Sequence, residues 1–129
     1  MAETTVYFYG PVTSSQDTTT KLTSDLFFSQ LQSTPGYILV DNRNITWEES
    51  FLDQTKQSDT AFFFVEIHQN QQNWECTLTI IDSETKKRVT KTEVFDGYYK
   101  ILMEAKNSLQ ELLENFRNYD NQEIKLNKN

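Results

Sequence analysis

With 129 residues, the chain is long enough for one domain that buries its own core, and 13% of its residues are aromatic. Its formal net charge of -7 argues against DNA or RNA as a partner and disfavours attachment to an anionic lipid surface, because both need a basic surface. The single cysteine, Cys76, excludes an intramolecular disulfide, and no run approaches the roughly 20 apolar residues of a membrane span.

The chain opens with a pattern typical of a buried strand followed by a helix. Residues 6–9 are apolar on both faces, as in a parallel strand that is covered on both sides. A helix is expected over 18–33, because apolar residues recur there at helical spacing. Three residues are candidates for its N-cap: Ser15, Asp17 and Thr18. Its expected core-facing side chains are Leu22, Leu26, Phe27 and Leu31.

The same succession then repeats. Residues 37–40 form a second short apolar strand, and 41–44 are its expected exit loop. Thr46 and Glu49 have the spacing of a capping box, which predicts a second helix running to about residue 57. Its inward side chains are expected to be Trp47, Phe51 and Leu52.

From residue 61 the apolar period changes from 3.6 to 2, which predicts a β-meander. Strands 61–69 and 72–82 form a hairpin whose register is indicated by matching apolar residues on one face. The expected pairs are Phe63 with Ile80, Val65 with Leu78, and Ile67 with Cys76. A third strand, 88–95, carries Lys91 and Glu93, as edge strands often do.

The last predicted element is a helix over about 98–119, which carries the clearest apolar stripe in the chain. Residues 120–129 are polar and are expected to form a disordered tail. The order β-α-β-α-β-β-β-α then predicts a single α/β domain over 1–119. Its five-stranded mixed sheet has the order 2-1-3-4-5, with helices on both faces.

A search for chemistry finds no catalytic set. His68 is the only histidine, and the expected register directs it to the face opposite Cys76 and toward Glu75. One histidine and one cysteine are too few for a zinc site, and no cofactor motif is present, so we expect neither metal nor cofactor. The loop after the first strand is the usual ligand position in an open α/β sheet. The candidate ligand residues there are Ser14, Ser15, Gln16, Asp41 and His68.

Four tyrosines are candidates for binding a protein partner, because tyrosine is enriched at interfaces. They are Tyr7, Tyr9, Tyr98 and Tyr99. The alternative is that each ring packs in the core while its hydroxyl reaches water.

Three segments resemble the TolB amino-terminal domain and its relatives, the curli-secretion lipoprotein CsgG and the penicillin-binding-protein activator LpoB. Residues 37–43 resemble that family's strand ending in V-D-R, and 60–65 resemble its A-D-Y-L-V strand. Residues 77–86 are similar to its V-x-L-V-D-x-x-T-G-K hairpin, although Lys86 stands where a glycine is usual. The likeness spans about 6–116.

The resemblance implies a non-catalytic protein-interaction module of the bacterial cell envelope. Such a module is periplasmic or associated with the outer membrane, and relatives are often anchored by a lipid on a segment that would precede this sequence. Two alternatives stay open: a small acidic chaperone or assembly factor, suggested by size and charge, and a small enzyme that uses the loop after the first strand. The sequence indicates neither the partner nor the oligomeric state.

Overall fold

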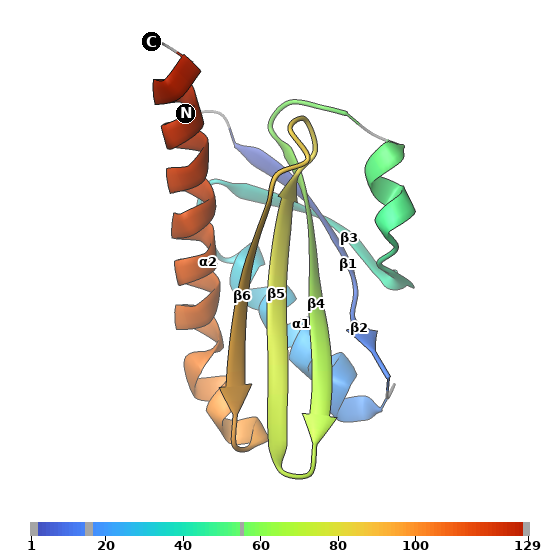
Figure 1. The fold of residues 1–129 in the computed structure, drawn as a ribbon. Coiled ribbons are helices and arrows are strands. Elements are labelled where there is room, and N and C mark those ends of the chain that lie inside the picture. The colour runs from blue at the N-terminus through green and yellow to red at the C-terminus, as the bar shows by residue number, and fades with distance from the viewer. Residues whose placement is uncertain (1–2, 15–16, 55, 128–129) are drawn as a thin grey trace.

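The computed structural model describes residues 3–14, 17–54 and 56–127, with side chains described as far as residue 118. It is a twisted mixed sheet with two long helices, α1 and α2 (Figure 1). In chain order the elements are β1 (Thr4–Gly10), β2 (Val12–Thr13), α1 (Thr18–Gln32), β3 (Tyr37–Thr46), the 3₁₀ helix η1 (Glu49–Asp53), β4 (Thr60–Asn70), β5 (Asn73–Asp82), β6 (Arg88–Phe95) and α2 (Tyr98–Asn127).

The predicted fold class and strand order are confirmed. The sheet runs β3-β1-β4-β5-β6, in which β1 lies parallel to both β3 and β4, and β4, β5 and β6 are antiparallel. The short strand β2 is an addition that the sequence did not predict. It follows Pro11 and pairs with the far half of β4. The chain order reverses at β1, whose two neighbours β3 and β4 lie on either side of it.

The hairpin register is confirmed at every expected pair. Phe63 lies opposite Ile80, Val65 opposite Leu78, and Ile67 opposite Cys76. Gln71, in the turn, adopts a φ of 57°. The register is well specified because both faces of β4 are buried. A slip of one residue would turn each side chain toward the opposite face of the sheet.

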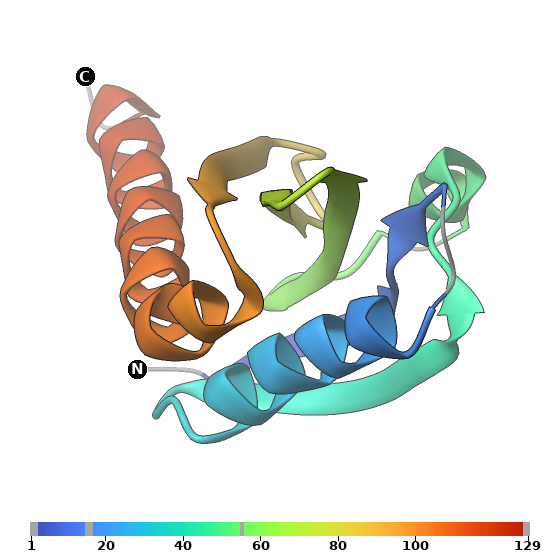
Figure 2. The ribbon, with the colours of Figure 1, turned by 90° about the horizontal axis from the view of Figure 1, so that it is seen from below.

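The sheet carries a separate core on each face, because successive side chains of β4 point to opposite sides. Phe63 and Val65 join the larger core, which α1 and α2 cover from the same face (Figure 2). Phe62 and Phe64 join the smaller core under Trp47. The segment after β3 therefore covers these two phenylalanines.

The N-cap of helix α1 is one of the three candidates predicted from the sequence, but the buried face of the helix differs from the prediction. Asp17 is the N-cap, and its carboxylate accepts a hydrogen bond from the Thr20 backbone N–H at 2.8 Å. Leu22 is 48% exposed, so its assignment to the core was wrong. Small polar residues take part of the buried face instead, and the Thr23 hydroxyl is satisfied within the helix by the Thr19 carbonyl. The buried side chains are Thr20, Thr23, Ser24, Phe27, Phe28 and Leu31.

The segment after residue 40 corrects two further expectations. Residues 41–44 are not a loop, because β3 continues to Thr46 alongside β1. The capping box does not form either. Glu48 is the N-cap of a five-residue 3₁₀ helix and makes no side-chain cap bond, and Trp47 precedes that helix. Continued pairing with β1 holds the chain extended through Thr46, so Thr46 is the last residue of a strand and not a helix cap.

Helix α2 begins where predicted, and its backbone remains helical to Asn127, past the expected end near residue 119. The tail predicted for 120–129 lies outside the residues whose side chains the structure describes. The apolar stripe of α2 is buried as expected: Ile101, Ala105, Leu109, Leu112, Leu113 and Phe116. Within the described part of the chain, neither helix has an apolar stretch that could cross a bilayer.

Candidate functional site

A cavity of about 460 Å³ opens where the first helix begins and the parallel strands end. Its walls include Asp17 and Lys21 from the start of α1, and Arg43 and Asn44 from the end of β3. This is the position at which the sheet's strand order reverses, and open α/β sheets bind ligands at such positions. The cavity thus lies beyond the first strand, next to the loop that the sequence offers as a ligand position, and binding of a ligand there stays a prediction.

The shape of the cavity depends on a bulge in β3. Tyr9 lies opposite Asn42, but Gly10 lies opposite Thr46, so three residues of β3 bulge out of the ladder. A Cβ atom on Gly10 would lie 2.6 Å from the backbone oxygen of Arg43, closer than such atoms approach. Glycine at this position lets the bulge pass over β1.

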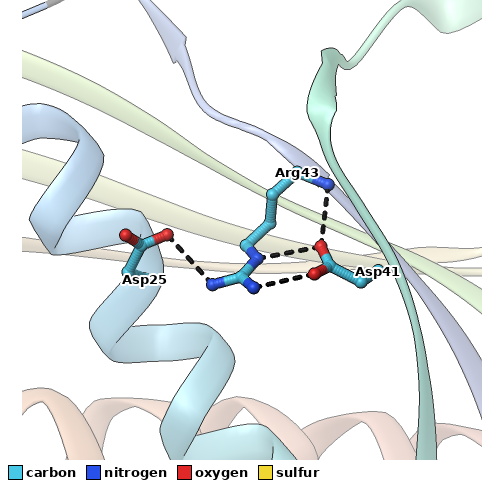
Figure 3. Close-up of polar contacts among 3 residues, drawn as sticks. All are labelled: Asp25, Asp41 and Arg43. Carbon is cyan, nitrogen blue, oxygen red and sulfur yellow. Dashed lines mark hydrogen bonds and ion pairs between the residues drawn. The ribbon is translucent and has the colours of Figure 1, made fainter.

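Arg43 is the centre of the polar contacts at the site (Figure 3). Its Nε and Nη2 donate to the two carboxylate oxygens of Asp41 at 2.8 and 2.7 Å, and its Nη1 donates to Asp25 Oδ1 at 3.1 Å. The guanidinium carbon also lies 3.7 Å from the centre of the Phe28 ring. Because Asp25 and Phe28 belong to α1, this one side chain ties the edge strand to the helix.

These contacts shift the protonation of the pair. The hydrogen bond from Arg43 lowers the pKa of Asp41 to about 2, and the Asp41 carboxylate in turn raises the pKa of Arg43. The Asp41 side chain is 48% exposed, so solvent screens the ion pair, which we expect to contribute below about 1 kcal/mol to folding stability. Asp41 and Arg43 therefore both stay charged at physiological pH.

A second hollow, of about 510 Å³, shares Lys21, Arg43 and Asn44 with the first. Asp25 and Asp41 complete its lining. The two hollows together present carboxylates and cations side by side. Three of the five N–H groups of Arg43 are already occupied by carboxylates. The arrangement thus suits a structural brace or a polar surface of mixed charge better than capture of a lone anion.

The structure brings some of the predicted ligand residues together and leaves others apart. Asp41 belongs to the site, whereas Ser15 and Gln16 lie outside the described residues. β2 pairs Thr13 with Ile67, so Ser14 and His68 are each the next residue along neighbouring strands, and both are exposed. Neither lines the two hollows. Among the residues the structure describes, no group of three metal-ligating side chains occurs.

The four candidate tyrosines divide by exposure. Tyr7 and Tyr9 are half-buried and pack against the smaller core, where Tyr9 stacks on Phe51 at a ring distance of 5.0 Å. Tyr98 is half-buried beside Trp74. Tyr99 is 60% exposed and is the one of the four that presents most of its ring to solvent.

Sequence reasoning missed two features of the surface. Arg43 was overlooked because residues 41–44 were expected to be a loop; in a strand, the spacing of Asp41 and Arg43 places both side chains on one face. The second feature is an exposed apolar surface on the first turns of α2, formed by Tyr99, Leu102 and Met103, which we call the α2 patch. Leu102 and Met103 are 53% and 70% exposed, and the i, i+3, i+4 spacing groups the three side chains.

No family model and no curated protein matches this chain. Among solved structures, its fold is similar to that of lipoprotein GNA1162 from Neisseria meningitidis, with a TM-score of 0.50 and 11% identity over 70% of this chain and 78% of that one. A weaker likeness, with a TM-score of 0.49 and 10% identity, covers 88% of this chain and 88% of PelC from Paraburkholderia phytofirmans, whose structure is a dodecamer. The chain is thus a mixed α/β domain, and it shares its fold with a bacterial lipoprotein.

Proposed function

We propose that this chain is a non-catalytic protein-interaction module of the bacterial cell envelope, either a lipoprotein or a periplasmic domain of the TolB amino-terminal, CsgG and LpoB type. The observation that carries the proposal is the likeness of its fold to a Neisseria lipoprotein over 70% of the chain. The three sequence segments that resemble the TolB-type family point the same way.

The α2 patch is the surface we assign to the protein partner. Its three side chains are each more than half exposed, and tyrosine and methionine are both enriched at protein interfaces. The acidic balance of the whole chain further favours a partner with a basic surface, which would speed encounter and increase specificity more than affinity. Of the four candidate tyrosines, Tyr99 is thus assigned to the partner surface. The rings of the three half-buried tyrosines pack against the core.

The test combines localisation with site-specific cross-linking in the source bacterium. The full-length protein is tagged at its chromosomal locus, and a photo-activated cross-linking amino acid replaces either Tyr99 or Glu84, an exposed turn residue. We expect the protein in the envelope fraction, with a discrete protein adduct from position 99 and none from position 84. Recovery in the cytosol would overturn the envelope assignment.

The non-catalytic part of the proposal has its own test. His68→Gln and Asp41→Asn remove the two side chains best suited to acid–base chemistry among the predicted ligand residues. Both variants should give the same adduct yield at position 99 and the same growth phenotype as the parent strain. A growth defect matching deletion of the gene, in a variant that is folded and abundant, would favour the enzyme alternative.

A further inference from the structure

The outer edge of β3 is unpaired within the described chain, and its role is independent of the proposed function. We infer that two copies of this chain associate through antiparallel pairing of β3 with β3 of the second copy, so that the two sheets join across a two-fold axis. The surface involved is residues 37–41, in the regular part of the strand before the bulge.

The first observation is that this edge is open. β3 ends the strand order, pairs with β1 on one side, and has no strand on its other side within the described chain (Figure 2). The Thr4 N–H donates to the Gly36 carbonyl at 2.9 Å. Alternation along a parallel ladder then directs the backbone groups of Ile38 and Val40 toward β1. Those of Tyr37, Leu39 and Asp41 point outward. A second strand would satisfy these outward groups.

The opposite edge of the sheet, β6, is protected against pairing with another strand, whereas β3 is not. Lys91 and Glu93 lie on the core-facing side of β6, opposite Leu78 and Cys76. Lys91 Nζ contacts Glu93 at 3.3 Å and Glu111 of α2 at 2.6 Å. Inward charges of this kind discourage edge-to-edge pairing. β3 has no such device before Asp41, and residues 26–40 contain no charged side chain at all.

The exposed side chains of this edge are complementary to themselves. With the two-fold axis at Leu39, Ile38 of each copy lies beside Val40 of the second copy on the outer face of the joined sheet. Ile38 is 48% exposed in the single chain and would be covered in this arrangement. One end of the segment carries Asp41, and the other carries Arg117, whose Nε donates to the Tyr37 hydroxyl at 3.2 Å. The two-fold axis places Tyr37 opposite Asp41 of the second copy, so opposite charges lie near each other although each chain carries -7. This complementarity favours a second copy as the occupant.

The size and charge of the surface determine how the association should behave. Five strand residues from each copy form an interface well below the standard of about 1,600 Å² in total, so the dimer should be weak and concentration-dependent. The net charges of the two copies repel outside the interface, and salt screens that repulsion over about 10 Å at 0.1 M ionic strength. Added salt should therefore strengthen the dimer.

The experiment compares the wild-type chain with Ile38→Lys and Leu22→Lys by sedimentation from micromolar to millimolar concentration, at low and high salt. Leu22 is the matched control because it is also 48% exposed but lies on α1. We expect wild type and Leu22→Lys to approach the mass of two chains, more so at high salt. The dissociation constant of Ile38→Lys should rise at least about tenfold, since a charge would replace the apolar contact with Val40 of the second copy and the two lysines would be diagonal neighbours across the axis.

Hydrogen exchange on the wild-type chain gives an independent measurement that needs no variant. The outward amides of Leu39 and Asp41 should exchange more slowly as concentration rises, while amides elsewhere in the sheet, apart from the outward amide of Tyr37, should not change. A monomer at every concentration, an equal dissociation constant for Ile38→Lys and wild type, or unchanged exchange at these two amides would each overturn the inference. If the chain is a monomer at every concentration, the open edge of β3 would instead be available to pair with an extended segment of a different protein.

Discussion

At the scale of single residues, the turn between β5 and β6 contains a substitution that should stabilise the protein. Lys86 adopts a φ of 64°, a conformation that costs a residue with a Cβ about 1–2 kcal/mol and costs glycine little. Glycine also increases the freedom of the unfolded chain, which offsets part of the gain. Lys86→Gly should therefore raise the free energy of unfolding by about 0.5–1 kcal/mol, seen as a melting temperature about 2–4 °C higher.

Lys87→Gly is the matched control, because Lys87 has a negative φ and gains nothing from glycine. It should lower the melting temperature. Equal melting temperatures for the two variants would show that backbone strain at Lys86 has no measurable cost.

The contact between Arg43 and Asp41 should make folding stability depend on pH in the acid range. The pKa of Asp41 is about 2 in the folded state, below its ordinary value of 3.8, so the unfolded chain binds more protons between these values. The stability that this carboxylate contributes is complete above pH 4 and is lost as the pH falls through about 2. Carbon-13 NMR titration of the side-chain carboxyl should show the low pKa directly, and Arg43→Gln should move it up toward 3.8.

Arg88→Gln is the control for that titration. Arg88 hydrogen-bonds Glu49 at 2.7 and 3.0 Å and lowers its pKa, so this variant should raise the pKa of Glu49 and leave that of Asp41 unchanged. An ordinary pKa for Asp41 in the wild-type protein would mean that the bidentate contact does not persist in solution.

At the scale of elements, the smaller core is the part of the fold most dependent on one side chain. Trp47 stacks on Phe64 with ring centres 4.8 Å apart and rings 7° from parallel, and it also contacts Phe62 and Phe51. Trp47→Ala should lower the free energy of unfolding by about 3–5 kcal/mol, because the cavity cannot collapse under a short 3₁₀ helix. Chemical unfolding followed by far-UV circular dichroism measures the loss.

Phe51→Ala provides the comparison, since Phe51 is only half-buried and should cost less than half as much. If both variants lost the same stability, the covering segment would act as one packed unit rather than through the tryptophan.

At the scale of the whole molecule, the two cores should unfold together. They share β4, whose neighbouring residues alternate between them, so one core cannot lose its strand without exposing the other. Trp47 reports on the smaller core and Trp74 on the larger. In the variants Trp47→Phe and Trp74→Phe, the remaining tryptophan's fluorescence and the circular dichroism signal should give coincident unfolding midpoints. Separate midpoints in either variant would show that the cores unfold independently.

The sequence by itself determined the elements whose apolar pattern is read locally. The β4–β5 register followed from matching residues such as Val65 and Leu78, because a slip would move every apolar side chain to the wrong face. The strand order followed from the right-handed crossovers that parallel strands require.

Only the tertiary structure decided where β3 ends and what its last residues do. The extension of β3 depends on Gly10, whose missing Cβ admits the bulge, and the role of Arg43 depends on α1 bringing Asp25 and Phe28 beside it. Leu22 fits the helical period as well as Phe27, yet only the placement of α1 on the sheet leaves one exposed and buries the other. Local sequence patterns indicate which side chains are apolar and need burial. Contacts between distant segments determine which of those side chains are buried and which surface stays exposed to solvent.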